Sequence, residues 1–187
     1  MIGYAFCGSF CTFSRSFAVL QELIRRGMDI QPLMSFNAYT TDTRFGQAQD
    51  WVARIEALCQ RPIIHTIVDA EPLGPAKPMQ ALVISPCTGN TLAKLACGIT
   101  DTSVCMATKA HLRCDRPLLI ALASNDAMSQ NLRNIAALRL RKGVHFVPME
   151  QDDPVGKPHS LVARFEMIPD VLDALLAGNV APEKFFL

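Results

Sequence analysis

Residues 85–91 are the stretch of the chain best suited to hold a ligand, because they are small and rich in hydrogen-bonding groups. They read Ser-Pro-Cys-Thr-Gly-Asn-Thr. A glycine lets a ligand approach the backbone closely, and a helix that begins after such a turn presents unpaired N–H groups to an anion. Thr88 or Asn90 could instead serve only as the cap of that helix. The residues alone leave both interpretations open, a ligand-binding turn and a capping turn.

The pattern on either side of this turn predicts a strand followed by a helix. Residues 81–84 are a short apolar run, as expected of a strand buried on both faces of a parallel sheet. Leu92, Leu95, Ala96 and Ile99 then recur three and four residues apart, which places them on one helix face. In open α/β sheets, ligands bind at the carboxyl ends of the strands. The turn is therefore expected at the ligand-binding edge of the sheet.

Two further stretches are expected at the same edge. Gly8 and Ser9 follow the first predicted strand and form a candidate phosphate cradle, although any strand-to-helix turn favours these residue types. Arg44 lies in the polar loop after the second predicted strand. Its guanidinium group suits bidentate binding of a carboxylate. A solvated surface arginine is the other interpretation.

The rest of the chain alternates between strands and helices. Strands are expected over residues 2–7, 29–34, 62–68, 81–84, 117–123 and 144–147, and helices over residues 12–26, 46–60, 92–99, 103–113, 132–142 and from about 160. This alternation predicts an α/β fold in three αβα layers, with a doubly wound, mostly parallel sheet of the Rossmann or flavodoxin-like kind. At this length, residues 1–187 are expected to form a single domain.

The composition argues against several classes of protein. A formal charge of +1 leaves no electrostatic footprint for nucleic acid. The sequence has neither an apolar run of about 18 residues nor a basic leader, so we expect a cytoplasmic protein that does not bind membranes. Seven cysteines without a CxxC pair indicate reduced thiols and no metal site. The carboxylates Glu150, Asp152 and Asp153 lie in a Pro/Gly loop and are expected to be solvated.

The turn also resembles a known family. Residues 86–91 are similar to the signature turn of the FMN-binding flavoproteins, which include cysteine decarboxylases whose turn reads Pro-Ala-Ser-Ala-Asn-Thr. Cys87, Thr88 and Gly89 depart from that turn, but they keep its small size and one hydroxyl. The resemblance therefore implies the fold and the flavin more strongly than decarboxylation. It extends beyond the turn to Lys94, Ala96, Gly98, Ile99 and Asp101.

The resemblance implies FMN as the cofactor, with its phosphate against Gly8, Ser9 and Ser35 and its isoalloxazine near residues 85–91. Asn90 would be the catalytic residue, orienting the substrate or the flavin. The family assembles as trimers or multiples of trimers with flavin at the interface between protomers, so a homo-oligomer is implied. The full set of implied cofactor-binding residues is Gly8, Ser9, Ser35, Ser85, Pro86, Thr88, Gly89, Asn90, Thr91 and Met106.

Five other stretches resemble one branch of this family, the B subunits of dipicolinate synthases. This branch implies a component in the NADP-linked oxidation of dihydrodipicolinate during sporulation, working with a separate A subunit that binds NADP. A flavin can accept the two electrons that such an oxidation releases. A non-catalytic partner of the A subunit and an FMN-dependent decarboxylase remain the alternatives. The matching stretches are residues 41–46, 70–75, 107–113, 124–127 and 161–164, and the implied substrate-binding residues for the small dicarboxylate are Arg44, Lys109, Arg113 and Asn125.

Overall fold

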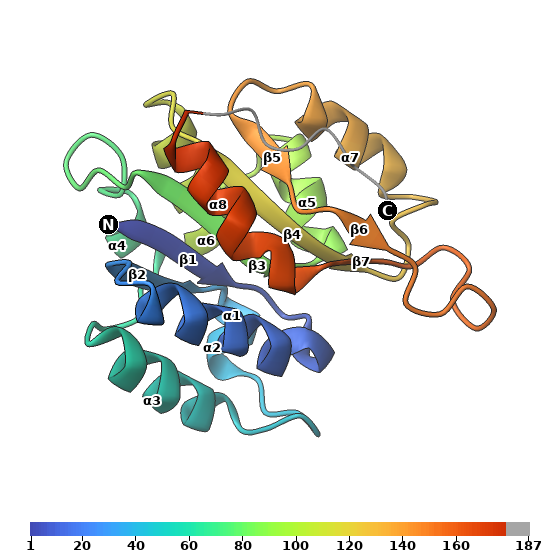
Figure 1. Cartoon of the computed structure of the whole chain (residues 1–187), viewed down its shortest axis with the longest axis horizontal. Coiled ribbons are helices and arrows are strands. Elements are labelled where there is room, and N and C mark those ends of the chain that lie inside the picture. The colour runs from blue at the N-terminus through green and yellow to red at the C-terminus, as the bar shows by residue number, and fades with distance from the viewer. Residues whose placement is uncertain (179–187) are drawn as a thin grey trace.

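The computed structural model describes residues 1–178, which form a seven-stranded sheet between layers of helices (Figure 1). The strand order is β2-β1-β3-β4-β7-β6, and β5 pairs with β4. Strands β1 to β5 are parallel, whereas β7 is antiparallel to β4 and β6. The strands are β1 (Ile2–Phe6), β2 (Ile30–Met34), β3 (Ala81–Cys87), β4 (Leu118–Ser124), β5 (Val144–Phe146), β6 (Met149–Glu150) and β7 (Leu161–Ala163).

Helices cover both faces of the sheet, with α1 and α8 on one side and α5 and α6 on the other (Figure 1). This confirms the predicted three-layer, mostly parallel α/β fold. No helix within residues 1–178 is long and apolar enough to cross a bilayer. The helices are α1 (Phe13–Arg25), α2 (Phe36–Thr40), α3 (Ala48–Cys59), α4 (Ile67–Ala70), α5 (Gly89–Ala96), α6 (Ser103–Leu112), α7 (Leu132–Arg139) and α8 (Ile168–Leu176), with 3-10 turns at Phe10–Thr12 and Phe165–Met167.

The central strands β1 and β3 are buried along their whole length. A buried hydrogen-bond cluster ties them to α1, because the hydroxyl of Tyr4 lies 3.0 Å from that of Ser16, which in turn lies 2.9 Å from that of Ser85. Desolvation by burial raises the pKa of Tyr4 far above its ordinary value, and these side-chain hydrogen bonds only partly oppose the shift. The cluster therefore fixes α1 against the two strands with neutral groups.

Several predicted boundaries were wrong: α5 and α7 end at residues 96 and 139 and not at 99 and 142, and three larger differences concern the sheet. Residues 62–68 do not form a strand, since only an isolated bridge joins Ile64 to Leu33, and Thr66 then caps α4 by accepting a bond from Asp69 N–H. Strand β3 does not stop at residue 84, and the ladder continues because Cys7 N–H donates to the carbonyl of Pro86 at 3.1 Å. A strand, β7, replaces the start of the helix expected from residue 160, and α8 begins only at residue 168.

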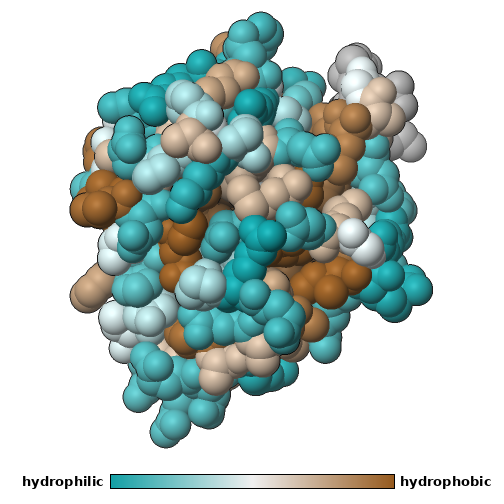
Figure 2. Space-filling model, turned by 90° about the vertical axis from the view of Figure 1, so that its left-hand side faces the viewer, coloured by the Kyte–Doolittle hydropathy of each residue, from teal (hydrophilic) through white to brown (hydrophobic). Residues whose placement is uncertain are grey.

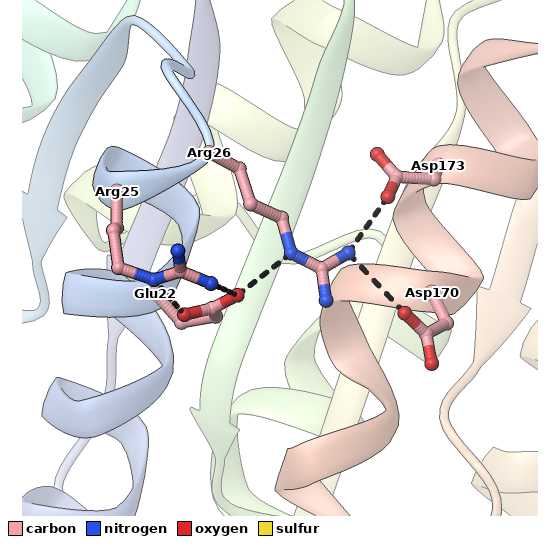
Figure 3. A network of polar contacts seen from close by, with 5 residues as sticks. All are labelled: Glu22, Arg25, Arg26, Asp170 and Asp173. Carbon is pink, nitrogen blue, oxygen red and sulfur yellow. Dashed lines mark hydrogen bonds and ion pairs between the residues drawn. The ribbon is translucent and has the colours of Figure 1, made fainter.

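The carboxyl end of α1 is joined to α8 on the surface by an ion-pair network (Figure 3). Glu22 accepts hydrogen bonds from Arg25 and Arg26, and Arg26 also bonds to Asp170 at 3.2 Å and Asp173 at 2.8 Å. The network fastens α8 to α1.

Seen from the side that carries α4, the molecule is mostly hydrophilic, with separate hydrophobic patches (Figure 2).

Candidate functional site

Two cavities meet at the carboxyl edge of the parallel sheet. One has a volume of about 790 Å³ and the other about 450 Å³, and both are lined by Gly8, Phe10, Thr88 and Asn90. Gly8 follows β1 and Thr88 follows β3. Since the chain builds outward from β1 to β2 on one side and to β3 on the other, this is the point where the strand order reverses. In flavodoxin-like sheets such a point is where FMN binds.

Thr88 is the cap of α5, and Asn90 is not. The hydroxyl of Thr88 accepts a hydrogen bond from Thr91 N–H at 3.2 Å, as an N-cap residue does. Asn90 is the second residue of the helix, is exposed, and lines both cavities. Its amide is thus available to a ligand as both donor and acceptor. The sequence left both residues open as helix caps. In the structure Thr88 is the cap, and Asn90 is free to contact a ligand.

Gly8, Ser9 and Ser35 each line at least one of these cavities. A Cβ added at Gly8 would lie 3.5 Å from the ring of Phe10, an ordinary contact, so packing within the protein does not require a glycine there. Ser9 lines the larger cavity, and Ser35 lines the smaller one. Ser35 also caps α2 by accepting from Ala38 N–H at 3.4 Å.

Gly89 is small for a reason that the sequence did not reveal. A Cβ on Gly89 would lie 2.5 Å from Asn131 Nδ2 and 2.5 Å from Ser124 Oγ. Both groups donate to Oδ1 of Asp126, and the bond from Ser124 is the main cause that lowers the pKa of that carboxyl. The space above Gly89 is therefore filled by the protein's own side chains, and the glycine serves the packing of α5.

Ser85, Pro86 and Met106 do not line either cavity. Ser85 and Pro86 belong to the buried strand β3, where a cis peptide bond joins them, and Met106 packs against the core from α6. Cys87 is buried beside them, and burial raises the pKa of its thiol well above the ordinary value. Small residue types mark this segment because the sheet packs tightly there.

The predicted substrate-binding residues separate into two groups. Arg44 and Asn125 line the larger cavity, but Lys109 and Arg113 line neither. They lie at the far end of α6, at least six residues beyond Ser103, so roughly 9 Å along the helix axis. There Arg113 forms an ion pair with Glu71 at 3.6 Å. Helical spacing showed which residues share a segment but not which end of the helix meets the site.

The structure brings to the larger cavity two cations that the sequence analysis did not assign. Arg15 comes from α1 and Lys157 from the loop between β6 and β7. Lys157 pairs with Asp152, also in the cavity lining, at 2.8 Å. No motif in the sequence marked either residue. Lys157 lies near Arg44 in the cavity lining because the antiparallel strand β7 brings the β6–β7 loop back to the carboxyl edge of the sheet.

Comparison with known proteins shows the family of this chain. The profile of the family described as Flavoprotein matches residues 1–178. The chain belongs to the Flavoprotein family. It is 41% identical over 182 residues to the B subunit of dipicolinate synthase from Bacillus subtilis (strain 168), covering 97% of this chain and 91% of that protein. The resemblance inferred from the sequence is thereby confirmed.

Two similar proteins with solved structures share the fold. The crystal structure of the dipicolinate synthase B subunit from Bacillus halodurans superposes with a TM-score of 0.88 at 36% identity, covering 100% of this chain and 95% of that one. The FMN-dependent cysteine decarboxylase SpaF superposes with a TM-score of 0.70 at 22% identity, covering 95% of each chain. The second likeness concerns the fold alone.

Proposed function

We propose that this member of the family binds FMN and works as the B component of a dipicolinate synthase. The observation that carries the proposal is the wall of Gly8, Phe10, Thr88 and Asn90 shared by two cavities at the β1/β3 switch point. Such a wall suits a flavin in one cavity and a substrate in the other. Similarity to the dipicolinate synthase B subunit of Bacillus subtilis supports the choice of reaction.

The smaller cavity suits the phosphate end of FMN. Gly8 and Ser35 line it, and Ser9 lies next to Gly8 on the wall of the larger cavity. An unsubstituted Cα at Gly8 leaves room for an oxygen atom to approach the backbone. The isoalloxazine would then lie beside Asn90, near the part of the turn that lines the cavities, residues 88–91. When bound, FMN supplies a two-electron acceptor.

The larger cavity suits a small dicarboxylate. Arg44 lines it with its guanidinium 4.9 Å above the ring of Phe45, and Asn125 adds a neutral donor and acceptor. Asn90 separates this cavity from the smaller one. In this arrangement Arg44 and Asn125 hold the substrate, and Asn90 orients its reacting face toward the flavin.

The proposal extends to partners. We propose that a separate A subunit supplies NADP for the oxidation of dihydrodipicolinate in a sporulating cell's cytoplasm, and that this chain forms a homo-oligomer of trimers or their multiples. The name of the similar protein from Bacillus subtilis, a B subunit, supports a second and different subunit. A non-catalytic partner subunit and an FMN-dependent decarboxylase of the same fold are the competing functions.

Titration of the purified protein with FMN tests the proposal. Ser9→Asp places a negative charge at the cradle and should weaken FMN binding by tenfold or more, about 1.4 kcal/mol. Ser14→Asp is the matched control, because Ser14 is exposed on α1 and lines neither cavity. Equal affinities of the two variants, or no saturable binding by the wild type, would contradict the flavin site.

The functions are then separated by activity. Protein stripped of flavin is mixed with the A subunit, dihydrodipicolinate and NADP, and FMN is added back. The proposed function requires product formation to rise with bound FMN. Full activity without FMN supports the non-catalytic partner, and release of carbon dioxide from a cysteine-ended peptide supports the decarboxylase.

A further inference from the structure

The larger cavity collects three cations from separate parts of the chain. Arg15 comes from α1, Arg44 from the loop that precedes α3, and Lys157 from the loop between β6 and β7. Two carboxylates, Asp126 and Asp152, also line the cavity. Three positive and two negative side chains leave the lining with a net charge of +1. This net positive charge favours the binding of an anion in the cavity.

The three cations differ in what already holds them. Arg15 forms an ion pair with Glu166 at 3.6 Å and stacks 5.0 Å above the ring of Phe165. These contacts direct it toward the junction of α1 and α8. Arg44, by contrast, has no ion pair with any residue in the described range 1–178. Its fork of donors is open to a carboxylate.

Lys157 retains donors for a ligand although it has a partner. Its ammonium group carries three donors, and one of them reaches Asp152 at 2.8 Å. The side chain is 47% exposed, so the remaining donors face the cavity opening or solvent. The ammonium group of Lys157 can therefore bind a second anionic group in addition to Asp152.

An ordered turn sets the place of this lysine. Within the β6–β7 loop, Gly156 N–H donates to Oδ1 of Asp153 and Lys157 N–H donates to the Asp153 carbonyl, both at 2.8 Å. Gln151 closes the loop by donating to the carbonyl of Pro158 at 3.0 Å. Lys157 is thus presented by a hydrogen-bonded turn.

We propose that Arg44 and Lys157 bind the two carboxylates of one small dicarboxylate in the larger cavity, and that Lys157 is the residue that selects dianions over monoanions. The inference rests on the proposed function, because it concerns the substrate class of the same site. Arg44 suits the bidentate contact and Lys157 the point charge. A ligand with a single carboxylate gains only the first of these contacts.

The probes are pyridine-2,6-dicarboxylate and pyridine-2-carboxylate, whose dissociation constants are measured by calorimetry on the full-length protein with and without FMN. Wild type should bind the dicarboxylate more tightly. Lys157→Met should weaken dicarboxylate binding roughly tenfold, as expected for a hydrogen bond to a charged group, and leave the monocarboxylate unchanged. Lys157→Arg should restore the preference, and Arg44→Met should weaken both ligands.

Lys142→Met is the matched control, because Lys142 pairs with Asp115 at 3.1 Å and does not line the larger cavity. Equal losses for the two ligands in Lys157→Met, or no loss for either, would overturn the inference, as would a wild type that binds neither ligand. FMN affinity is measured in the same samples. Loss of flavin binding with an intact dicarboxylate preference would refute the flavin proposal and leave this one standing.

Discussion

A methyl group at position 89 should destabilise the protein even when no ligand is bound. In Gly89→Ala the new Cβ falls 2.5 Å from Asn131 Nδ2 and 2.5 Å from Ser124 Oγ, about 1 Å inside van der Waals contact. Neither group is free to move, because both donate to Asp126 and Asn131 also accepts a bond from Asn134 at 2.8 Å. The strain must therefore break part of this network or displace α5.

The size of the effect follows from overpacking. Inserting one methyl group into a well-packed site costs about 1–3 kcal/mol. The helix propensity that alanine gains over glycine is about 1 kcal/mol in a helix interior, and it should be smaller at position 89, the first residue of α5, so it offsets only part of this cost. For a chain of this length, the loss corresponds to a melting temperature lower by roughly 2–12 °C.

The measurement is thermal unfolding by calorimetry, with Gly8→Ala as the matched variant. A Cβ at Gly8 meets only an ordinary contact of 3.5 Å, so its melting temperature should match that of the wild type. That methyl group would instead occupy the shared wall of the two cavities and weaken FMN binding by roughly tenfold. The packing argument fails if Gly89→Ala melts at or above the wild-type temperature.

Three further predictions concern single residues and their contacts. The Asn90→Asp variant should melt no lower than the wild type, since an acid near a helix N-terminus is stabilising by about 0.3–1 kcal/mol. Its product formation with the A subunit should collapse, and retained activity would reject a role for Asn90. Hydrogen bonds from Arg25 and then Arg26 lower the pKa of Glu22 from 4.5 to about 2, so their stabilisation is present above pH 4.5 and lost as the pH falls toward 2. The melting-temperature difference between wild type and Arg26→Ala should thus shrink over that range, and a constant difference would refute the assignment. Burial raises the pKa of Cys7 to about 12, so its thiol should resist alkylation in the folded protein and react after unfolding, as peptide mass mapping would show.

The layers of this fold were predictable because the buried strands are recognisable as short, continuous apolar runs in the sequence. Residues 81–84 are continuously apolar, and helical spacing follows them, so the parallel sheet and its ligand-binding edge could be inferred from local pattern. The end of β3 could not be inferred from the local pattern. Ser85 and Pro86 are residue types that usually interrupt a strand, and only the neighbouring β1 extends the ladder past them.

The site was predictable in part for the same reason. Gly8, Ser35 and Asn90 follow directly after strands or begin a helix, so their positions at one edge are fixed by topology. Lys157 depends instead on the antiparallel return of β7, a segment too short and apolar for its periodicity to separate strand from helix. The pairing of β7 with β4 and β6 joins distant parts of the chain, so the spacing of apolar residues within one segment does not predict it.

The wall between the two cavities has a thermodynamic consequence. Because the same four residues border both spaces, a molecule in one changes the surface met by a molecule in the other. Linkage requires that coupling to be reciprocal: the factor by which bound flavin alters dicarboxylate affinity equals the factor by which bound dicarboxylate alters flavin affinity. Either titration therefore yields the coupling free energy of the pair, and its sign reports whether the wall favours joint occupancy or exclusion.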